Sequence, residues 1–194
     1  MNIVHFEQEF MNPNITSKEE ILNQCRLIVQ AEGLGALTMR HVAEQCGTAL
    51  GSLYNYFPSK DDLILESIRS IWQDVFHEEG ESFDPKDFRS LVHWFSDSLG
   101  RMKKLYPGFF TLHAMSFGSE EKEKGKAERD RVFAHMKDMM RMTLAQDPKV
   151  QKDAFSTMPE DQFVDIVFLS IIYSHLESWN DEEGLTALIN KTLY

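Results

Sequence analysis

The sequence predicts an all-α protein, with a three-helix N-terminal domain followed by a C-terminal helical bundle. Three observations carry this prediction. Apolar residues recur every three or four positions in most segments, capping residues precede several of these segments, and no segment alternates apolar and polar residues as a strand would. A glycine turn between two short helical segments near the N-terminus further indicates a helix-turn-helix within the first domain.

The first helix is expected to begin after Ser17, which forms a capping box with Glu20. Residues 1–16 precede it and are expected to be a flexible leader. They contain no Lys or Arg, so a basic arm that reaches into a DNA minor groove is not expected. The buried face of the first helix would carry Ile21, Cys25, Ile28 and Val29.

The helix-turn-helix is expected between Thr38 and Leu63. Thr38 is a suitable N-cap for the first short helix, and Gly47 stands where the turn needs a positive φ. The second short helix is expected over residues 49–56, and Pro58 stops it. In such a motif the second helix enters the major groove of DNA.

The second short helix and its surroundings have suitable chemistry for DNA contact. Small residues early in the helix let the backbone approach DNA, and tyrosine hydroxyls can donate to phosphates. Ser59 and Asp62 form a capping box, and Lys60 lies where its ammonium can meet a phosphate. The candidate DNA-binding residues are Thr38, Arg40, Thr48, Ala49, Leu50, Gly51, Ser52, Tyr54, Asn55, Tyr56 and Lys60.

The DNA-binding domain of the tetracycline-repressor (TetR) family of transcriptional regulators resembles the segment LTMRHVAEQCGTALGSLYNYFPSKDDLI. That family's first helix and the turn after it are similar to ILNQCRLIVQAEGLGALTMR, which starts at Ile21. Ala49 and Leu50 depart from the family pattern, which usually has Ser and then Lys or another polar residue. We expect Thr48 to take over the capping role, and Leu50 to face a thymine methyl group.

The resemblance implies double-stranded operator DNA as a partner, and C-terminal helices that bind a small-molecule effector and form a homodimer. The helix-turn-helix domain would then span residues 17–62, and the effector-binding and dimerisation domain residues 63–194. An effector would change the separation of the two recognition helices through the helix that links the domains.

The remaining helices are placed by apolar spacing and by caps. The run from Ser119 to Arg131 is rich in charge and is expected to be a solvated loop and helix start without a function. We expect one helix to open at Ser59, another to be capped and opened by Asp84 and Pro85, and a short aromatic helix after Pro107. An amphipathic helix over 132–144 and a polar loop over 146–159 should follow, and the final helices are expected over 160–180 and 183–193.

Aromatic and methionine side chains on several of these helices are expected to enclose one apolar cavity, with His113 or Tyr173 as its polar anchor. Taken one by one, each of these residues is better explained as core. The candidate ligand-binding residues are Trp72, Phe76, Trp94, Phe95, Phe109, Phe110, His113, Phe117, Met136, Met140 and Tyr173.

The segment between Phe163 and Tyr173 is apolar nearly all round, so the helix that contains it should be buried on every side. A partner subunit could cover its second face, although a central core helix in a monomer would have the same pattern. The candidate dimer-interface residues are Phe163, Val167, Ile171, Ile172, His175 and Trp179.

Composition limits the other function classes. The net charge of −11 is unusual for a DNA-binding protein, but residues 1–60 carry 4 basic and 6 acidic residues, so most acidity lies in the C-terminal part. No apolar run is long enough for a membrane span, and we expect a cytoplasmic protein with no cofactor and no metal site. Cys25 and Cys46 are interpreted as buried fillers, with a thiol switch as the alternative.

The sequence therefore predicts a ligand-responsive DNA-binding transcriptional regulator, a repressor that a small apolar or aromatic effector releases from DNA. No arrangement of catalytic residues is recognisable, so an enzyme is not expected. The alternative is a helical ligand-binding dimer with little or no DNA affinity, which the acidic balance and the apolar Leu50 would suit.

Overall fold

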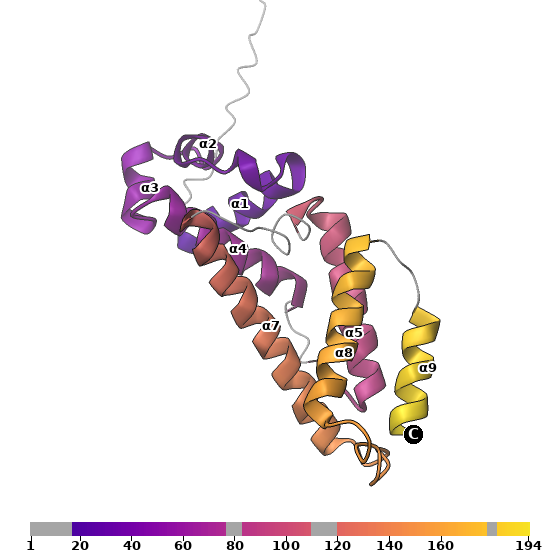
Figure 1. Ribbon diagram of the computed structural model, residues 1–194. Coiled ribbons are helices and arrows are strands. Elements are labelled where there is room, and N and C mark those ends of the chain that lie inside the picture. Colours follow the sequence, from indigo (N-terminus) through magenta and orange to yellow (C-terminus); the bar gives the residue numbers. More distant parts are fainter. Residues whose placement is uncertain (1–16, 77–82, 110–119, 178–181) are drawn as a thin grey trace, which may run out of the picture. The chain divides into compact units, whose positions relative to one another are not determined.

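The computed structural model describes residues 17–76, 83–109, 120–177 and 182–194, and every regular element in these ranges is a helix (Figure 1). The all-α prediction is therefore confirmed for the described chain. The chain divides into two compact units, Met1–Ser67 (unit 1) and Ile68–Tyr194 (unit 2). The boundary predicted after residue 62 and this division both fall within one helix, α4.

Unit 1 is built from short helices whose ends are fixed by local signals. Its elements are α1 (Lys18–Glu32), the 3-10 helix η1 (Leu34–Ala36), α2 (Met39–Gln45), α3 (Leu50–Tyr56) and the start of α4 (Lys60–Phe76). The predicted capping box is present, because Ser17 Oγ accepts from the Glu20 amide at 3.1 Å and the Ser17 amide donates to Glu20 at 2.9 Å. Gly47 has a φ of 60°, as the turn between α2 and α3 was expected to require.

The core of unit 1 lies where the apolar faces of these helices meet. Leu53 and Phe57 are fully buried and anchor α3 and the turn after it. Ser59 caps α4, because its hydroxyl accepts from the Asp62 amide at 3.1 Å and donates to the Asp62 carboxylate at 2.7 Å. Ser59 is therefore confirmed as the cap of α4, and this cap fixes where Lys60 emerges.

Unit 2 contains the rest of α4 together with α5 (Phe88–Leu105), α7 (Glu120–Gln146), α8 (Glu160–Glu177) and α9 (Glu182–Leu193). Helices α5, α7 and α8 pack against one another, and α9 lies on the outer side of α8 and α5 in Figure 1. Helix α5 ends at Leu105, ahead of Pro107, as expected. None of the helices in the described part of the chain is long and apolar enough to cross a membrane.

Two predictions for unit 2 are wrong, namely the cap of one helix and the solvated loop within the charged run. Helix α5 is capped by Asp87 and not by Asp84, because Asp87 and Ser90 bond reciprocally through side chain and backbone at 2.9 and 3.2 Å. Helix α7 begins at Glu120, so the charged run predicted as largely solvated is helical from there onward. Glu128 and Arg129, within that run, are each only 9% exposed.

The C-terminal end of the chain is tied to the start of α5 through Asp147, which is buried. Its carboxylate accepts hydrogen bonds from the Tyr194 hydroxyl at 2.6 Å, from the Phe88 amide at 3.1 Å and from the Lys149 amide at 3.0 Å. Burial alone would raise the pKa of Asp147, but these three hydrogen bonds outweigh it and hold the pKa below its usual value. The ionised carboxylate is therefore part of the fold of unit 2.

Candidate functional site

The first candidate site lies on α3, whose outward side chains form what we call the α3 surface: Ala49, Leu50, Gly51, Ser52, Tyr54, Asn55 and Tyr56. Leu53 on the opposite side is fully buried and holds the helix to unit 1. Leu50 is 38% exposed and Tyr54 is 47% exposed, and Ser52 is half-buried. The α3 surface is therefore presented to solvent by a helix whose other side is fixed in the core.

Two cations stand near the α3 surface in the sequence and are not engaged elsewhere. Arg40 on α2 and Lys60 at the start of α4 are both exposed, and within the described residues neither makes a hydrogen bond or an ion pair. Lys18, which could also have supplied positive charge, is instead paired with Glu66 at 3.2 Å. Arg40 and Lys60 are thus the cations of unit 1 that remain available for phosphate groups.

The start of α3 differs from the sequence-based expectation. Ala49 is the N-cap and provides no side-chain hydrogen bond, and the amide of Thr48 donates to the carbonyl of Ala43 at 3.0 Å. The expected capping role of Thr48 is therefore wrong. Thr38 does cap α2, since its hydroxyl accepts from the His41 amide at 3.1 Å.

The fold does not require a residue as small as glycine at Gly51, which belongs to the α3 surface. A Cβ atom added at Gly51 would meet no atom within 4 Å, and its φ is not in the left-handed region. The glycine therefore leaves open space outside the protein, which is what close approach of a DNA backbone needs.

The two cysteines belong to the core of unit 1. Both are buried and unpaired. Burial raises the pKa of both thiols, and that of Cys46 reaches about 11, with Cys25 adding to the increase. Because the thiolate is the reactive form, the structure favours the interpretation as buried fillers over the thiol switch.

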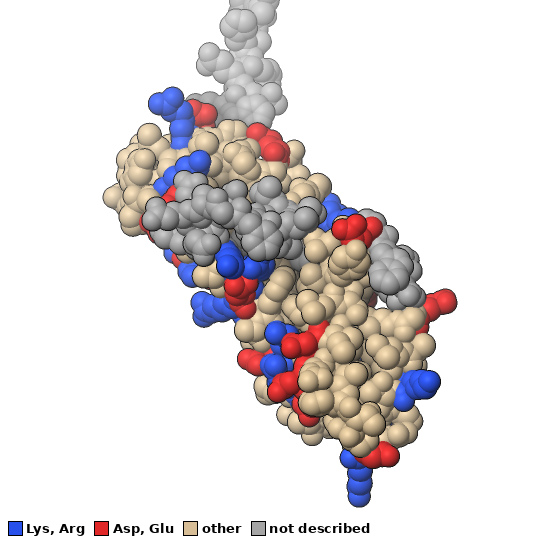
Figure 2. Space-filling model, viewed as in Figure 1, with Lys and Arg blue, Asp and Glu red and all other residues tan. Residues whose placement is uncertain are grey.

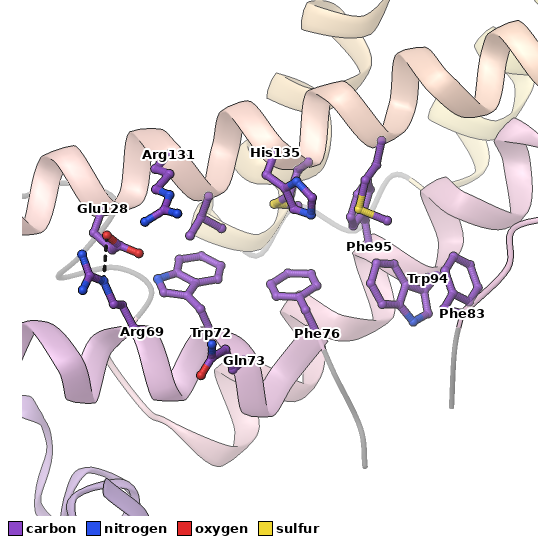
Figure 3. A pocket seen from close by; sticks show the side chains of 13 residues that line it. Arg69, Trp72, Gln73, Phe76, Phe83, Trp94, Phe95, Glu128, Arg131 and His135 are labelled. Atoms are coloured by element: carbon purple, nitrogen blue, oxygen red, sulfur yellow. Dashed lines mark ion pairs between the residues drawn. The ribbon is translucent and has the colours of Figure 1, made fainter. Parts of the chain in front are cut away.

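The second candidate site is a cavity of about 580 Å³ within unit 2, between the second half of α4, the α5 region and α7 (Figure 3). Its volume lies within the range of about 300–1,000 Å³ that is usual for small-molecule sites. The cavity is lined by Arg69, Trp72, Gln73, Phe76, Phe83, Trp94, Phe95, Glu128, Arg131, Val132, His135, Met136 and Met139.

The structure brings only some of the candidate ligand-binding residues to this cavity. Those that line it are Trp72, Phe76, Trp94, Phe95 and Met136. Phe109 and Met140 are buried beside it in the core and do not line it, and Tyr173 is 53% exposed on α8, away from the lining. Phe110, His113 and Phe117 lie outside the described residues. Tyr173 is therefore not the polar anchor of this cavity.

Sequence reasoning missed the polar residues of the cavity. Arg69 on α4 pairs with Glu128 on α7 at 3.0 Å, and both contribute to the lining. Arg131 and His135 follow Glu128 at helical spacing, on the same side of α7 as Val132 and Met136. A signal was present in the sequence, since Glu128 and Arg131 at the end of the charged run and His135 after it recur at helical spacing.

The candidate dimer-interface residues are mostly buried inside the subunit itself, which corrects the prediction. Phe163, Val167, Ile171 and Ile172 are at most 7% exposed, so they have no surface to offer a partner. His175 is half-buried and bonds to Ser96 Oγ at 3.1 Å, and Trp179 lies outside the described residues.

The exposed apolar residues of α8 lie on its other side. We call this set, with one residue of α9, the α8 face: Ile166, Leu169, Tyr173 and Leu188. The three α8 residues follow one another at helical spacing, and Leu169 is 62% exposed. Figure 2 shows a broad area without charges over α8 and α9, with acidic and basic side chains at its border.

Comparison with known proteins relates most of unit 1 to a family. Residues 21–67 match the family described as "Bacterial regulatory proteins, tetR family". The HTH-type transcriptional repressor KstR2 of Rhodococcus jostii (strain RHA1) is 34% identical over 59 residues, which cover 30% of this chain and 29% of that repressor. The chain therefore matches less than a third of the length of this curated relative.

The fold as a whole also has solved relatives. The crystal structure of BioQ with its double-stranded DNA operator superposes with a TM-score of 0.52 at 17% identity, and covers 91% of this chain and 98% of BioQ. At this identity the likeness concerns the fold, which extends through both units.

Proposed function

Because the chain belongs to the tetR family of bacterial regulatory proteins, we propose that it is a transcriptional repressor that binds double-stranded operator DNA and is released by a small-molecule effector. The α3 surface would contact the bases, with Arg40 and Lys60 on phosphates, and the cavity of unit 2 would hold the effector. No catalytic role is proposed for any residue.

The observation that carries this proposal is the state of the α3 surface. Within the described residues, its side chains and the two cations near it in sequence make no side-chain hydrogen bond or ion pair, with Tyr56 the exception. Because these residues belong to a domain of a DNA-binding family and make no such bonds within the fold, contact with DNA best explains their presence. The acidic net charge is compatible with this proposal, because a small number of phosphate contacts needs only a small number of cations.

Fluorescence anisotropy with DNA from upstream of the protein's own gene tests the proposal. Lys60→Ala should weaken binding and reduce the slope of log affinity against log salt by about 1, because one phosphate contact is lost. Tyr54→Phe, which removes only a hydroxyl, should weaken binding by a smaller factor. Lys104→Ala removes a cation that is also exposed, on α5, and serves as the matched control.

Wild-type affinity and salt slope in both Lys60→Ala and Tyr54→Phe would show that the α3 surface does not contact DNA. If the wild-type chain bound no upstream DNA but still bound small molecules, the alternative would hold, namely a helical ligand-binding protein without DNA affinity.

We further propose a homodimer in which the α8 face of one subunit packs on that of its partner. Exposed apolar residues at helical spacing are unfavourable in water and are typical of helix–helix interfaces. Sedimentation should show a dimer at micromolar concentration. Leu169→Asp should give a folded monomer, because the substitution lies on an exposed residue of the subunit. A monomeric wild type would contradict this assembly.

A further inference from the structure

The cavity of unit 2 has two ends of different chemistry. Figure 3 shows Arg69, Glu128 and Arg131 together at one end, and Phe95, Trp94 and Phe83 at the other, with Trp72 and Phe76 between them. A cavity with a charged end and an aromatic end fits a molecule that has a charged group on an apolar body. The sign of the charge at the first end then decides whether that group is an anion or a cation.

The charged end carries an excess of positive charge. Two guanidinium groups, those of Arg69 and Arg131, face a single carboxylate, that of Glu128, which is already paired with Arg69 at 3.0 Å. Arg131 is exposed and, among the described residues, makes no ion pair or hydrogen bond of its own. Among the residues that line the cavity, one guanidinium charge at this end therefore has no carboxylate to balance it.

A buried donor without an acceptor lies at the same end. Trp72 is 4% exposed, and its indole Nε1 has no hydrogen-bond partner within the described part of the chain. In Figure 3 this nitrogen is on the side of the ring that faces Arg69, Glu128 and Arg131. A buried N–H without an acceptor is unfavourable, and an indole can only donate, so the group fits an incoming acceptor and not a donor.

The aromatic end is preformed as a layered apolar wall. The rings of Phe83 and Trp94 are stacked with centroids 4.3 Å apart, and Trp94 meets Phe76 edge-on at 5.6 Å. Trp72 and Phe76 are stacked at 5.7 Å, so the wall is continuous from Trp72 to Phe83. Such a surface of ring faces favours flat or flexible apolar groups.

Building on the proposed function, we propose that the effector is an amphipathic anion: a carboxylate, held by Arg131 and the Trp72 indole beside the Arg69–Glu128 pair, on an apolar body that lies against Phe76, Trp94 and Phe83. Guanidinium groups and N–H donors together select a carboxylate over a neutral amide or an ammonium group. Arg69 and Trp72 belong to α4, the helix that continues into unit 1, so the anion would act on that helix directly.

Isothermal titration calorimetry on the full chain, without DNA, tests this inference with matched probes. Naphthalene-2-carboxylate and decanoate are each compared with the isosteric neutral amide. The wild type should bind each acid at least tenfold more tightly than its amide. Arg131→Gln should reduce this ratio toward one, and Trp72→Phe, which keeps a ring of similar shape but no N–H, should weaken acid binding.

Lys137→Gln is the matched control, because it removes one positive charge from the same helix at a residue outside the cavity lining. It should leave the acid-to-amide ratio unchanged. Equal or tighter binding of the amides, no binding of either acid, or an unchanged ratio in Arg131→Gln would each overturn the inference.

A separate measurement distinguishes this failure from failure of the proposed function. Operator affinity is measured with and without a saturating acid. If the acid binds with the expected preference but leaves DNA affinity unchanged, the anionic class stands and effector control does not. If DNA binding responds to a neutral ligand only, effector control stands and the anionic class does not.

Discussion

The α3 surface and the cavity of unit 2 place functional side chains in opposite structural settings. Residues such as Tyr54 and Lys60 are exposed, and the fold of unit 1 is held by others, such as Leu53. In the cavity, Trp72 is 4% exposed and stacks on Phe76, so the residues proposed to bind a ligand are also part of the core.

This difference decides what mutations can report. On the α3 surface, a substitution can change DNA affinity while the free energy of unfolding stays constant. In unit 2, a substitution of a buried residue changes packing as well as binding, so conservative pairs are needed to separate the two effects. Two kinds of result would contradict this difference. One is a substitution on the α3 surface that changes the free energy of unfolding as well as DNA affinity, and the other is a substitution of a buried residue in unit 2 that changes binding alone.

The largest expected effect is on a residue of α8. Ile171→Asp should lower the free energy of unfolding by about 3–5 kcal/mol, because it places a carboxylate without a partner in the core of the subunit. Leu169→Asp, two residues earlier on the exposed side, should change it by only about 0.5 kcal/mol. Urea unfolding at protein concentrations low enough to give monomers measures both.

If Ile171→Asp were as stable as the wild type and merely monomeric, Ile171 would belong to the interface after all, and the assignment of the α8 face would be reversed. The pair therefore separates core from interface on a single helix.

The sequence predicted this helix but not which of its sides faces inward. Ile166 and Leu169 are as apolar as Val167 and Ile171, so spacing alone cannot tell the exposed side from the buried one. The subunit fold makes that distinction, and it depends on helices far away in the sequence.

Unit 1 was predictable in more detail because its signals are local. The caps at Ser17 and Ser59 and the glycine at residue 47 act over three or four residues, and each is confirmed. The Arg69–Glu128 pair joins residues far apart in the sequence, and nothing near either residue points to the other. At the start of α5, the prediction chose Asp84, but the observed cap is Asp87, which has a partner, Ser90, three residues along the chain.

The next prediction concerns a polar residue that the fold of unit 2 requires. Asp147→Asn should lower the free energy of unfolding at pH 7 by about 1.5–3 kcal/mol, since hydrogen bonds to a charged acceptor are weakened. The folded pKa of Asp147 lies below the unfolded value of about 3.9. Its stabilisation is therefore complete well above pH 4 and is lost as the pH falls toward the folded pKa.

Urea unfolding at several pH values between about 7 and 2.5 measures this effect. The difference between the wild type and Asp147→Asn should shrink as the pH falls below about 4. Asp97→Asn is the control, because Asp97 is an exposed carboxylate on α5 that makes no hydrogen bond within the described residues. A difference that stayed constant with pH would mean that the ionised state of Asp147 contributes nothing to the fold.

The last prediction combines a small change in the free energy of unfolding with a clear change in operator affinity. Gly51→Ala should raise the free energy of unfolding by about 0.5–1 kcal/mol, because alanine suits a helix better than glycine and the added methyl group meets no atom within 4 Å. The same methyl group projects from the α3 surface, so operator affinity should fall while the protein becomes more stable.

Gly35→Ala is the matched control, since Gly35 is also exposed, also lacks a positive φ and also has open space around an added Cβ, but lies on η1 and not on α3. It should leave operator affinity unchanged. Thermal unfolding and anisotropy measured on the same preparations compare the two substitutions. If Gly51→Ala bound the operator as well as the wild type, DNA would not approach α3 closely. The strongest evidence that the α3 surface serves a partner, while the cavity residues also serve the core, would then be lost.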